Sequence, residues 1–199
     1  MEPADRSAAL ALIAARHKVA LPGTPSSRAG EDVLRALYEA LAQDASARLV
    51  EAGDASAGGF VAGTLDLRAT EARVRARMAR RPWQLARLAV RNLLDPRHVL
   101  ARRRWESRIP PAGAGYVLTI GVTSRASVRG RALLDALEDA FAESGALESW
   151  VDTEATNGRA LAFYGRCGYR EVDRAFGQVL LAKALEPRPH TRGEGGSSA

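Results

Sequence analysis

The sequence predicts a single α/β domain with a mixed central sheet and flanking helices. Residues 116–123 form a short apolar, β-branched run, and residues 147–151 form a second such run. Between them, apolar residues recur at helical spacing and end before a glycine: Leu133, Leu134, Leu137, Phe141 and Gly145. Two strands joined by a helix of this length make a parallel βαβ unit with a right-handed crossover. This unit is the centre of the predicted fold.

Composition places the chain among ordinary globular proteins. Its 199 residues suit one domain, and its net charge of +6 comes mostly from arginine. Cys167 is the single cysteine, so no intrachain disulfide can form, which fits a reducing compartment. No apolar run reaches membrane-span length and no signal-peptide pattern is present, so we expect a cytoplasmic protein. No Cys/His spacing indicates a metal site.

The elements around the central unit follow from periodicity. Helices are predicted over residues 4–20 and 31–43, with a Pro/Gly/Ser loop over 21–30 between them. Residues 47–52 and 59–67 read as strands of an antiparallel hairpin. A further helix begins at Asn157 and ends at Gly168. The last two strands are predicted to begin at Arg170 and to span residues 176–182.

The loop before the helix at Gly130 is a predicted anion site. A loop that leads into a helix N-terminus gathers unpaired backbone N–H groups at the positive end of the helix dipole. Arg125, Arg129 and Arg131 add positive charge there. The alternative is an ordinary αβ unit whose arginines are solvated, and loop composition alone favours this alternative.

Residues 157–169 carry the most specific pattern. They fit N-x-x-A-x-x-F-Y-x-x-x-G-[FY] at each fixed position: Asn157, Ala160, Phe163, Tyr164, Gly168 and Tyr169. In this pattern the chain resembles the GCN5-related N-acetyltransferase (GNAT) family. The resemblance is strong over residues 116–182 and looser over residues 4–67. It implies a GNAT-type domain whose mixed sheet is splayed between the strands ending at Val122 and Val151, with acetyl-CoA as co-substrate.

The acyl-CoA loop of this family usually reads [QR]-x-x-G-x-[GA]. Here Arg125 takes the first position and Gly130 the last, because this register turns the leucines of the following helix toward the core. Val128 stands where the family has a central glycine. A glycine there lets the backbone approach a pyrophosphate closely, whereas valine adds a branched Cβ. Retained binding with altered geometry, weakened binding and lost binding all remain open.

The resemblance also implies roles for individual residues. Backbone groups of Ile120, Gly121 and Val122 would meet the pantetheine arm, and Asn157 would contact the cofactor. The pyrophosphate would lie among the residues of the loop and the first helical turn: Arg125, Ser127, Val128, Arg129, Gly130 and Arg131.

Tyr164 would be the general acid that protonates the departing thiolate. A phenol suits this task, because its pKa of about 10 lies just above that of a thiol. The alternative role for Tyr164 is a structural hydrogen bond within a half-buried helix. Asp152 and Glu154, at the end of the second strand, are candidates for the general base, alongside water or a residue elsewhere.

An arginine-rich helical insert over residues 68–115 is predicted between the third and fourth strands. It carries thirteen arginines against three acidic residues, and Trp83 and Trp105 flank its apolar face. Three interpretations compete: a helical cap with solvated arginines, an acceptor-site wall for an acidic substrate, and an interfacial helix pair or nucleic-acid contact. The insert lacks interleaved aromatics, which argues against nucleic acid.

We therefore expect an acyl-CoA-dependent N-acetyltransferase. Residues 1–185 would form the domain, and residues 186–199 a disordered tail. The acetyl group would pass by direct attack in a ternary complex to an amine of a small molecule, or of a protein or peptide. The alternative is a non-catalytic GNAT-like module that binds an acidic partner or an anionic membrane surface through the insert. The sequence does not indicate an oligomeric state.

Overall fold

The computed structural model describes residues 3–53, 57–83, 86, 113–123 and 129–187. In this part of the chain, six strands form one sheet in the order β1-β2-β3-β4-β6-β5. β3 and β4 pair in parallel, and the other neighbours pair antiparallel. The strands are β1 Ala47–Gly53, β2 Gly58–Thr64, β3 Gly115–Val122, β4 Glu148–Glu154, β5 Arg170–Ala175 and β6 Gln178–Ala184. The predicted α/β class and mixed sheet are confirmed.

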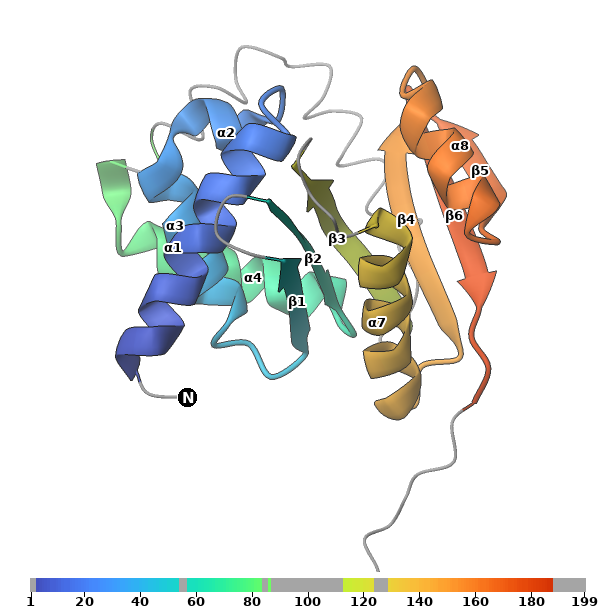
Figure 1. The fold of residues 1–199 in the computed structure, drawn as a ribbon, viewed down its shortest axis with the longest axis horizontal. Helices are drawn as coiled ribbons and strands as arrows, with labels where there is room; N and C mark the ends of the chain where they lie inside the picture. The colour runs from blue at the N-terminus through green and yellow to red at the C-terminus, as the bar shows by residue number, and fades with distance from the viewer. Residues whose placement is uncertain (1–2, 54–56, 84–85, 87–112, 124–128, 188–199) are drawn as a thin grey trace, which may run out of the picture.

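Helices cover both faces of this sheet (Figure 1). Phe60 and Val61 are neighbours on β2, so their side chains point to opposite faces. Phe60 packs in a cluster with α1 and α3, whereas Val61 packs in a cluster with α7 and α8. The helices are α1 Pro3–Ala20, α2 Pro25–Ala29, α3 Glu31–Leu41, α4 Leu67–Ala79, α7 Gly130–Glu143 and α8 Gly158–Arg166.

The parallel contact between β3 and β4 is short. It extends over three residue pairs, the last joining Val117 to Val151. On the other side of β3, Gly63 pairs with Val117 and Ala62 with Thr119, so Leu118 is an extra residue. Such a β-bulge bends its strand and increases the local twist. β3 and β4 diverge beyond it, which confirms the predicted splay.

Two predictions about the region after β2 need correction. The strand predicted over 59–67 ends at Thr64, and Leu67 instead begins α4. The Asp66 side chain caps this helix by accepting a hydrogen bond from the Ala69 N–H at 3.0 Å. The insert therefore lies between the second and third strands of the described sheet, not the third and fourth, because no described strand precedes α1. Residues 87–112 of the insert lie outside the described residues.

Glycines let α7 lie close against the sheet. A Cβ added to Gly115 would overlap the Phe141 ring, and one added to Gly63 would come within 2.5 Å of the same ring. Phe141 is fully buried at this crossing. α7 packs on β1, β2, β3 and β4. It therefore spans both sides of the splay and fixes where its own N-terminus meets the end of β3.

His17 joins α1 to α3 through a buried hydrogen bond. Its Nδ1 lies 2.6 Å from the Tyr38 hydroxyl, and its Nε2 lies 3.2 Å from Thr24 Oγ1. Which ring nitrogen donates depends on the tautomer of His17. The ring also stacks on Phe60. Burial lowers the pKa of His17 from 6.5 to about 4.

This depressed pKa predicts a loss of stability in acid. The unfolded chain binds a proton at His17 more readily than the folded chain does, so the contribution is complete above pH 6.5 and lost as pH falls toward about 4. Between pH 7.5 and 4.5 we expect the free energy of unfolding to fall by about 2–3 kcal/mol from this group. Urea denaturation of the wild type and His17→Gln at several pH values measures this change. An equal fall in the variant would contradict it.

Candidate functional site

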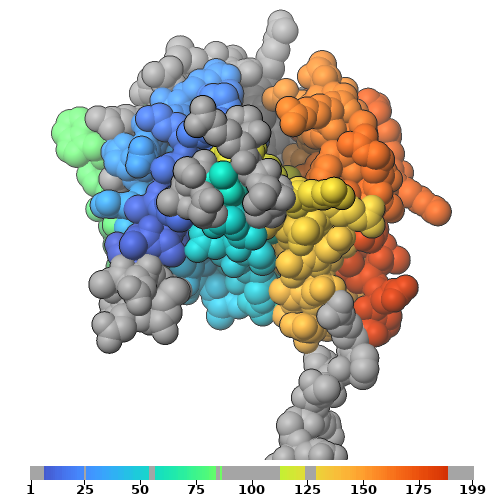
Figure 2. All heavy atoms as spheres, in the orientation of Figure 1, coloured from blue at the N-terminus to red at the C-terminus, as the bar shows by residue number. Residues whose placement is uncertain are grey.

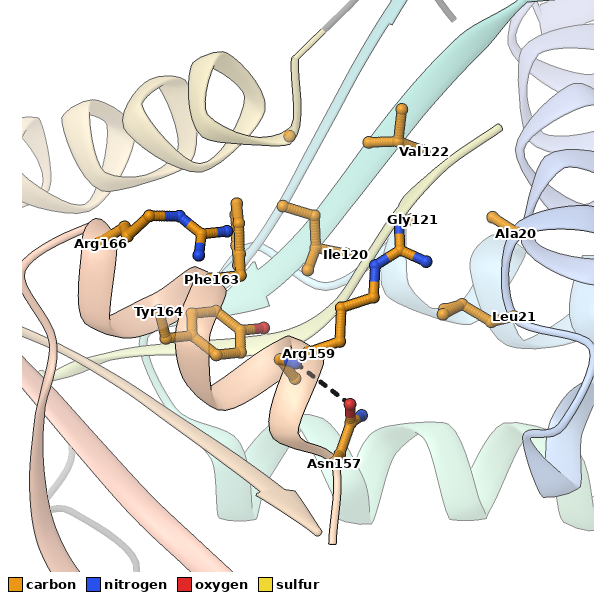
Figure 3. A pocket seen from close by; sticks show the side chains of 12 residues that line it. Ala20, Leu21, Ile120, Gly121, Val122, Asn157, Arg159, Phe163, Tyr164 and Arg166 are labelled. Carbon is orange, nitrogen blue, oxygen red and sulfur yellow. Dashed lines mark hydrogen bonds between the residues drawn. The ribbon is translucent and has the colours of Figure 1, made fainter. Parts of the chain in front are cut away.

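A cavity of about 440 Å³ opens where β3 and β4 diverge. In Figure 2 the helices coloured blue and α8, coloured orange, stand on either side of this hollow. Figure 3 shows the cavity from close by, with side chains from α1, β3 and α8 around it. The described residues that line it are Ala20, Leu21, Ile120, Gly121, Val122, Gly130, Asn157, Arg159, Ala160, Phe163, Tyr164 and Arg166.

β3 supplies one wall of the cavity with its last residues. Ile120, Gly121 and Val122 lie beyond the bulge, where β4 no longer pairs with the strand. Their other edge remains bonded to β2, as in the pair Phe60–Gly121. Backbone groups on the side of the splay are therefore presented to the cavity rather than to a neighbouring strand. The three predicted cofactor-contact residues of this strand lie together at the cavity.

The N-terminus of α7 borders the same cavity. Arg129 is the N-cap residue, its side chain makes no capping hydrogen bond, and Gly130 lines the cavity. Among the described residues, no side chain caps the first-turn N–H groups of this 14-residue helix. A Cβ at Gly130 would lie 3.5 Å from the Phe163 ring, an ordinary contact, so packing within the chain does not require glycine. The absent side chain instead leaves the helix end open to a ligand.

The remaining residues of the predicted loop are placed differently or fall outside the description. Arg125, Ser127 and Val128 lie outside the described residues. Arg131 turns toward α8, where its Nη1 donates to the Arg166 carbonyl at 2.9 Å. It does not line the cavity. The consequence of valine at position 128 therefore stays a prediction.

Two arginines of α8 were not singled out from the sequence. Arg159 and Arg166 both line the cavity, and in Figure 3 Arg159 extends from α8 toward Gly121. Neither guanidinium has an ion pair or hydrogen bond to a described residue. They lie seven residues apart, with Phe163 between them on the same helical stripe, and this spacing could have indicated them. No carboxylate stands among the described lining residues, so this wall favours an anionic ligand.

Tyr164 directs its hydroxyl into the cavity (Figure 3). The residue is 5% exposed, and its ring lies edge-on to Phe163 and Tyr169. No described residue forms a hydrogen bond with the hydroxyl, so the alternative of a structural hydrogen bond gains no support. Burial, and then the charges of Asp152 and Cys167, raise the pKa of Tyr164 well above its usual value. The phenol therefore holds its proton across the physiological pH range.

The sequence model of the acetyltransferase (GNAT) family matches residues 98–169. That segment includes β3, α7, β4 and α8, the elements that build the cavity. Over these residues the chain is similar to the GNAT family. No curated protein matches the chain in sequence.

Solved structures with this GNAT fold cover nearly the whole chain. An aminoglycoside 6'-N-acetyltransferase complexed with coenzyme A has a TM-score of 0.58 and 14% identity, covering 94% of this chain and 97% of its own. PaiA N-acetyltransferase from Thermoplasma acidophilum, in complex with coenzyme A, has a TM-score of 0.53 and 12% identity, with 93% and 96% covered. The ribosomal-protein-S18-alanine N-acetyltransferase from Escherichia coli has a TM-score of 0.52 and 16% identity, with 96% and 94% covered. At these identities the likeness shows the fold.

The two carboxylates considered as general bases differ in placement. Asp152 Oδ1 accepts a hydrogen bond from the Tyr116 hydroxyl at 2.6 Å, which fixes its orientation. Glu154 is exposed at the end of β4. Neither lines the cavity among the described residues. No group of three or more possible metal ligands gathers in the described part of the chain, and no described helix is long and apolar enough to cross a membrane.

Asn157 acts as a structural cap at the start of α8. Its Oδ1 accepts a hydrogen bond from the Ala160 N–H at 3.1 Å, drawn as the dashed line in Figure 3. This bond satisfies one of the free N–H groups at the start of α8 and leaves the side-chain NH₂ exposed at the cavity. The proposed cofactor contact and the cap can therefore coexist on one side chain.

Substitution of Asn157 should separate these two roles. Asn157→Ala should lower the free energy of unfolding by about 1 kcal/mol through loss of the cap. Asn157→Asp keeps the capping oxygen and adds negative charge at the helix N-terminus, so its stability should match the wild type. Chemical denaturation of the three proteins without ligand checks this. Equal stability of the alanine variant and the wild type would show that the cap contributes nothing.

Proposed function

We propose that the chain transfers an acetyl group from acetyl-CoA to an amine. The observation that carries this proposal is the cavity at the splay, which connects the open N-terminus of α7 to the buried hydroxyl of Tyr164. Acetyl-CoA has a matching arrangement, with phosphates at one end and a thioester at the other. Structures in complex with coenzyme A among the GNAT folds above support the same choice.

The described residues fit this co-substrate. The cavity volume of about 440 Å³ lies within the roughly 300–1,000 Å³ of small-molecule sites. The helix dipole of α7 and the side chain of Arg129 would hold the pyrophosphate. Backbone groups of residues 120–122 would bind the amide groups of the pantetheine arm. Bound in this way, acetyl-CoA would supply a thioester carbonyl beside Tyr164.

The chemistry then requires two proton movements. The amine nitrogen bonds to the thioester carbonyl carbon, the carbon–sulfur bond breaks, and Tyr164 gives its proton to the departing sulfur. The amine loses a proton to a base, for which Asp152 or a water is proposed. Asp152 and Leu180 are paired across β4 and β6, and Leu180 packs with Tyr116 on the sheet face opposite the Val61 cluster that contains Tyr164. Asp152 is therefore on the opposite sheet face from the cluster that contains Tyr164.

The acceptor would approach past the end of α1. Ala20 and Leu21 line the cavity there and are small or apolar. Both a small-molecule amine and a protein or peptide amine remain proposals, and the names of the solved structures include both kinds. We further propose that residues 1–185 act as one domain, in which residues 68–115 form the insert. Residues 188–199 of the predicted tail lie outside the described residues.

Calorimetry should detect acetyl-CoA binding in the micromolar range. Arg129→Glu should weaken it at least tenfold, because a negative side chain at the start of α7 repels the pyrophosphate. Arg75→Glu is the matched control, since Arg75 is an exposed arginine of α4 that does not line the cavity. Absence of heat at millimolar acetyl-CoA would remove the acetyltransferase proposal and favour the alternative of a non-catalytic module.

Tyr164→Phe should separate chemistry from binding. Its acetyl-CoA affinity should stay within about twofold of the wild type, whereas thiol release with a panel of amines should fall by about 10²–10⁴-fold. Tyr169→Phe is a matched control, because its hydroxyl lies 2.6 Å from Ser149 Oγ and has a structural partner. That control should lose stability and keep its rate. Undiminished thiol release by Tyr164→Phe would show that another group protonates the sulfur.

A further inference from the structure

A second cavity, of about 260 Å³, lies between α3 and α4. It shares no lining residue with the cavity at the splay. α3 and α4 lie on the side of the molecule away from α8 (Figure 1). Two small residues facing each other across the helices, Ala40 and Ala76, leave room for it. The remaining lining residues are polar or charged: Gln43, Asp44, Arg73, Arg77 and Arg80.

The three arginines form one stripe of α4. Their spacing of four and three residues puts them on the same helical face, and all three line the cavity. Like charges at this spacing destabilise a helix by about 0.2–0.5 kcal/mol per pair. Arg77 and Arg80 lie near the C-terminus of α4, where the helix dipole favours positive charge. The helix dipole explains why these arginines lie near the C-terminus of α4. It does not explain why their side chains lie on the one face that borders the cavity.

One of the three arginines is already neutralised. Arg73 Nη1 donates to Asp44 Oδ1 at 2.6 Å. Asp44 is buried, and its carboxylate also accepts hydrogen bonds from the Thr70 hydroxyl and from Ser46. This carboxylate is therefore fully used by the contacts that join the end of α3 to the start of α4. It is not available to Arg77 or Arg80.

Arg77 and Arg80 have no such partner in the part of the chain that the structure describes. Neither forms an ion pair or hydrogen bond with a described residue through its guanidinium. Arg77 is half-buried, so part of its stem already packs against protein while its charge is uncompensated. Gln43 adds a side-chain amide to the same cavity. Beside one completed ion pair, the cavity thus presents an amide and two guanidiniums that no described residue pairs with.

We propose that the α3–α4 cavity binds a small anion carrying a phosphoryl or sulfate group. The planar guanidinium fork matches the oxygens of such a group and can bind two of them at once. Gln43 can donate to a further oxygen. The volume of about 260 Å³ is below the roughly 300 Å³ at which drug-sized pockets begin, so a phosphate with a small organic remainder fits and a nucleotide cofactor does not. The site is independent of the acetyl-CoA cavity.

The test uses inorganic phosphate at constant ionic strength. Phosphate should raise the thermal midpoint of the wild type, and calorimetry should show an affinity that falls at least tenfold in Arg77→Gln/Arg80→Gln. Arg75→Gln is the control, because it removes an exposed charge from the same helix outside the cavity. The control should respond to phosphate as the wild type does. No response in the wild type, or an equal response in the double variant, would overturn the proposal.

Two further experiments determine where phosphate binds and which kind of anion the cavity prefers. Arg129→Glu should keep the phosphate response, which excludes the α7 N-terminus as its source. Glycerol phosphate in place of inorganic phosphate tells whether an organic remainder occupies the cavity: tighter binding supports a phosphorylated metabolite, and equal binding supports the free anion. None of these experiments contains acetyl-CoA. A negative phosphate result therefore leaves the acetyltransferase proposal unaffected, and a negative acetyl-CoA result leaves the proposed anion site unaffected.

Discussion

The parallel pairing of β3 with β4 stops after three residue pairs, and the position of the site follows from where it stops. A sheet normally satisfies its backbone groups through the next strand. Here the extra residue Leu118 bends β3 away, and residues 120–122 present one edge to a cavity instead. α7 bridges the two diverging strands and brings its uncapped N-terminus to the same place. Strand edge, helix end and Tyr164 thus converge because of one short contact.

The cavity and the α3–α4 cleft use charge in different ways. At the splay, Arg159 and Arg166 stand without carboxylates among the described lining residues, so an entering anion meets no internal competitor. In the α3–α4 cleft, Asp44 competes for one arginine and is itself held by Thr70 and Ser46. The buried polar cluster around Asp44 fixes the two helices to each other. Contact between the two helices therefore does not depend on Arg77 and Arg80, which pair with no described residue.

Much of the fold could be predicted from the sequence, because the register and the ends of most helices depend on residues within or next to the same helix. The register of α7 follows from Leu133, Leu134 and Leu137, which are all almost fully buried, and Gly145 adopts a φ of +88° just after the helix. Asn157 caps α8 as its position predicts. Local alternation failed at Leu67, because Asp66 captures the following N–H groups and turns the chain into a helix. The sequence contains a signal for this helix, because Asp66, a good N-cap residue, precedes a run rich in arginine and alanine.

The site was less predictable, since its geometry depends on contacts between distant segments. The bulge at Leu118 exists relative to β2, and no residue near it marks it in the sequence. Arg159 and Arg166 became site residues only when α8 was placed against the splay. The hydrogen bond between His17 and Tyr38 joins residues 21 positions apart. Motif spacing located Tyr164 and Gly130, but the charges around them came from the tertiary arrangement.

The three-pair contact also has a mechanical meaning. β1, β2 and β3 form one antiparallel ribbon, and β4, β6 and β5 form another, each paired along most of its length. The two ribbons are joined by three residue pairs between β3 and β4, and α7 packs against strands of both ribbons. A molecule bound in the splay would contact the edge of β3 on one side and α8 on the other. It would take the place of the strand pairing that is absent there. Occupancy of the cavity would thereby stiffen the contact between the two ribbons, so that a bound ligand would complete the sheet.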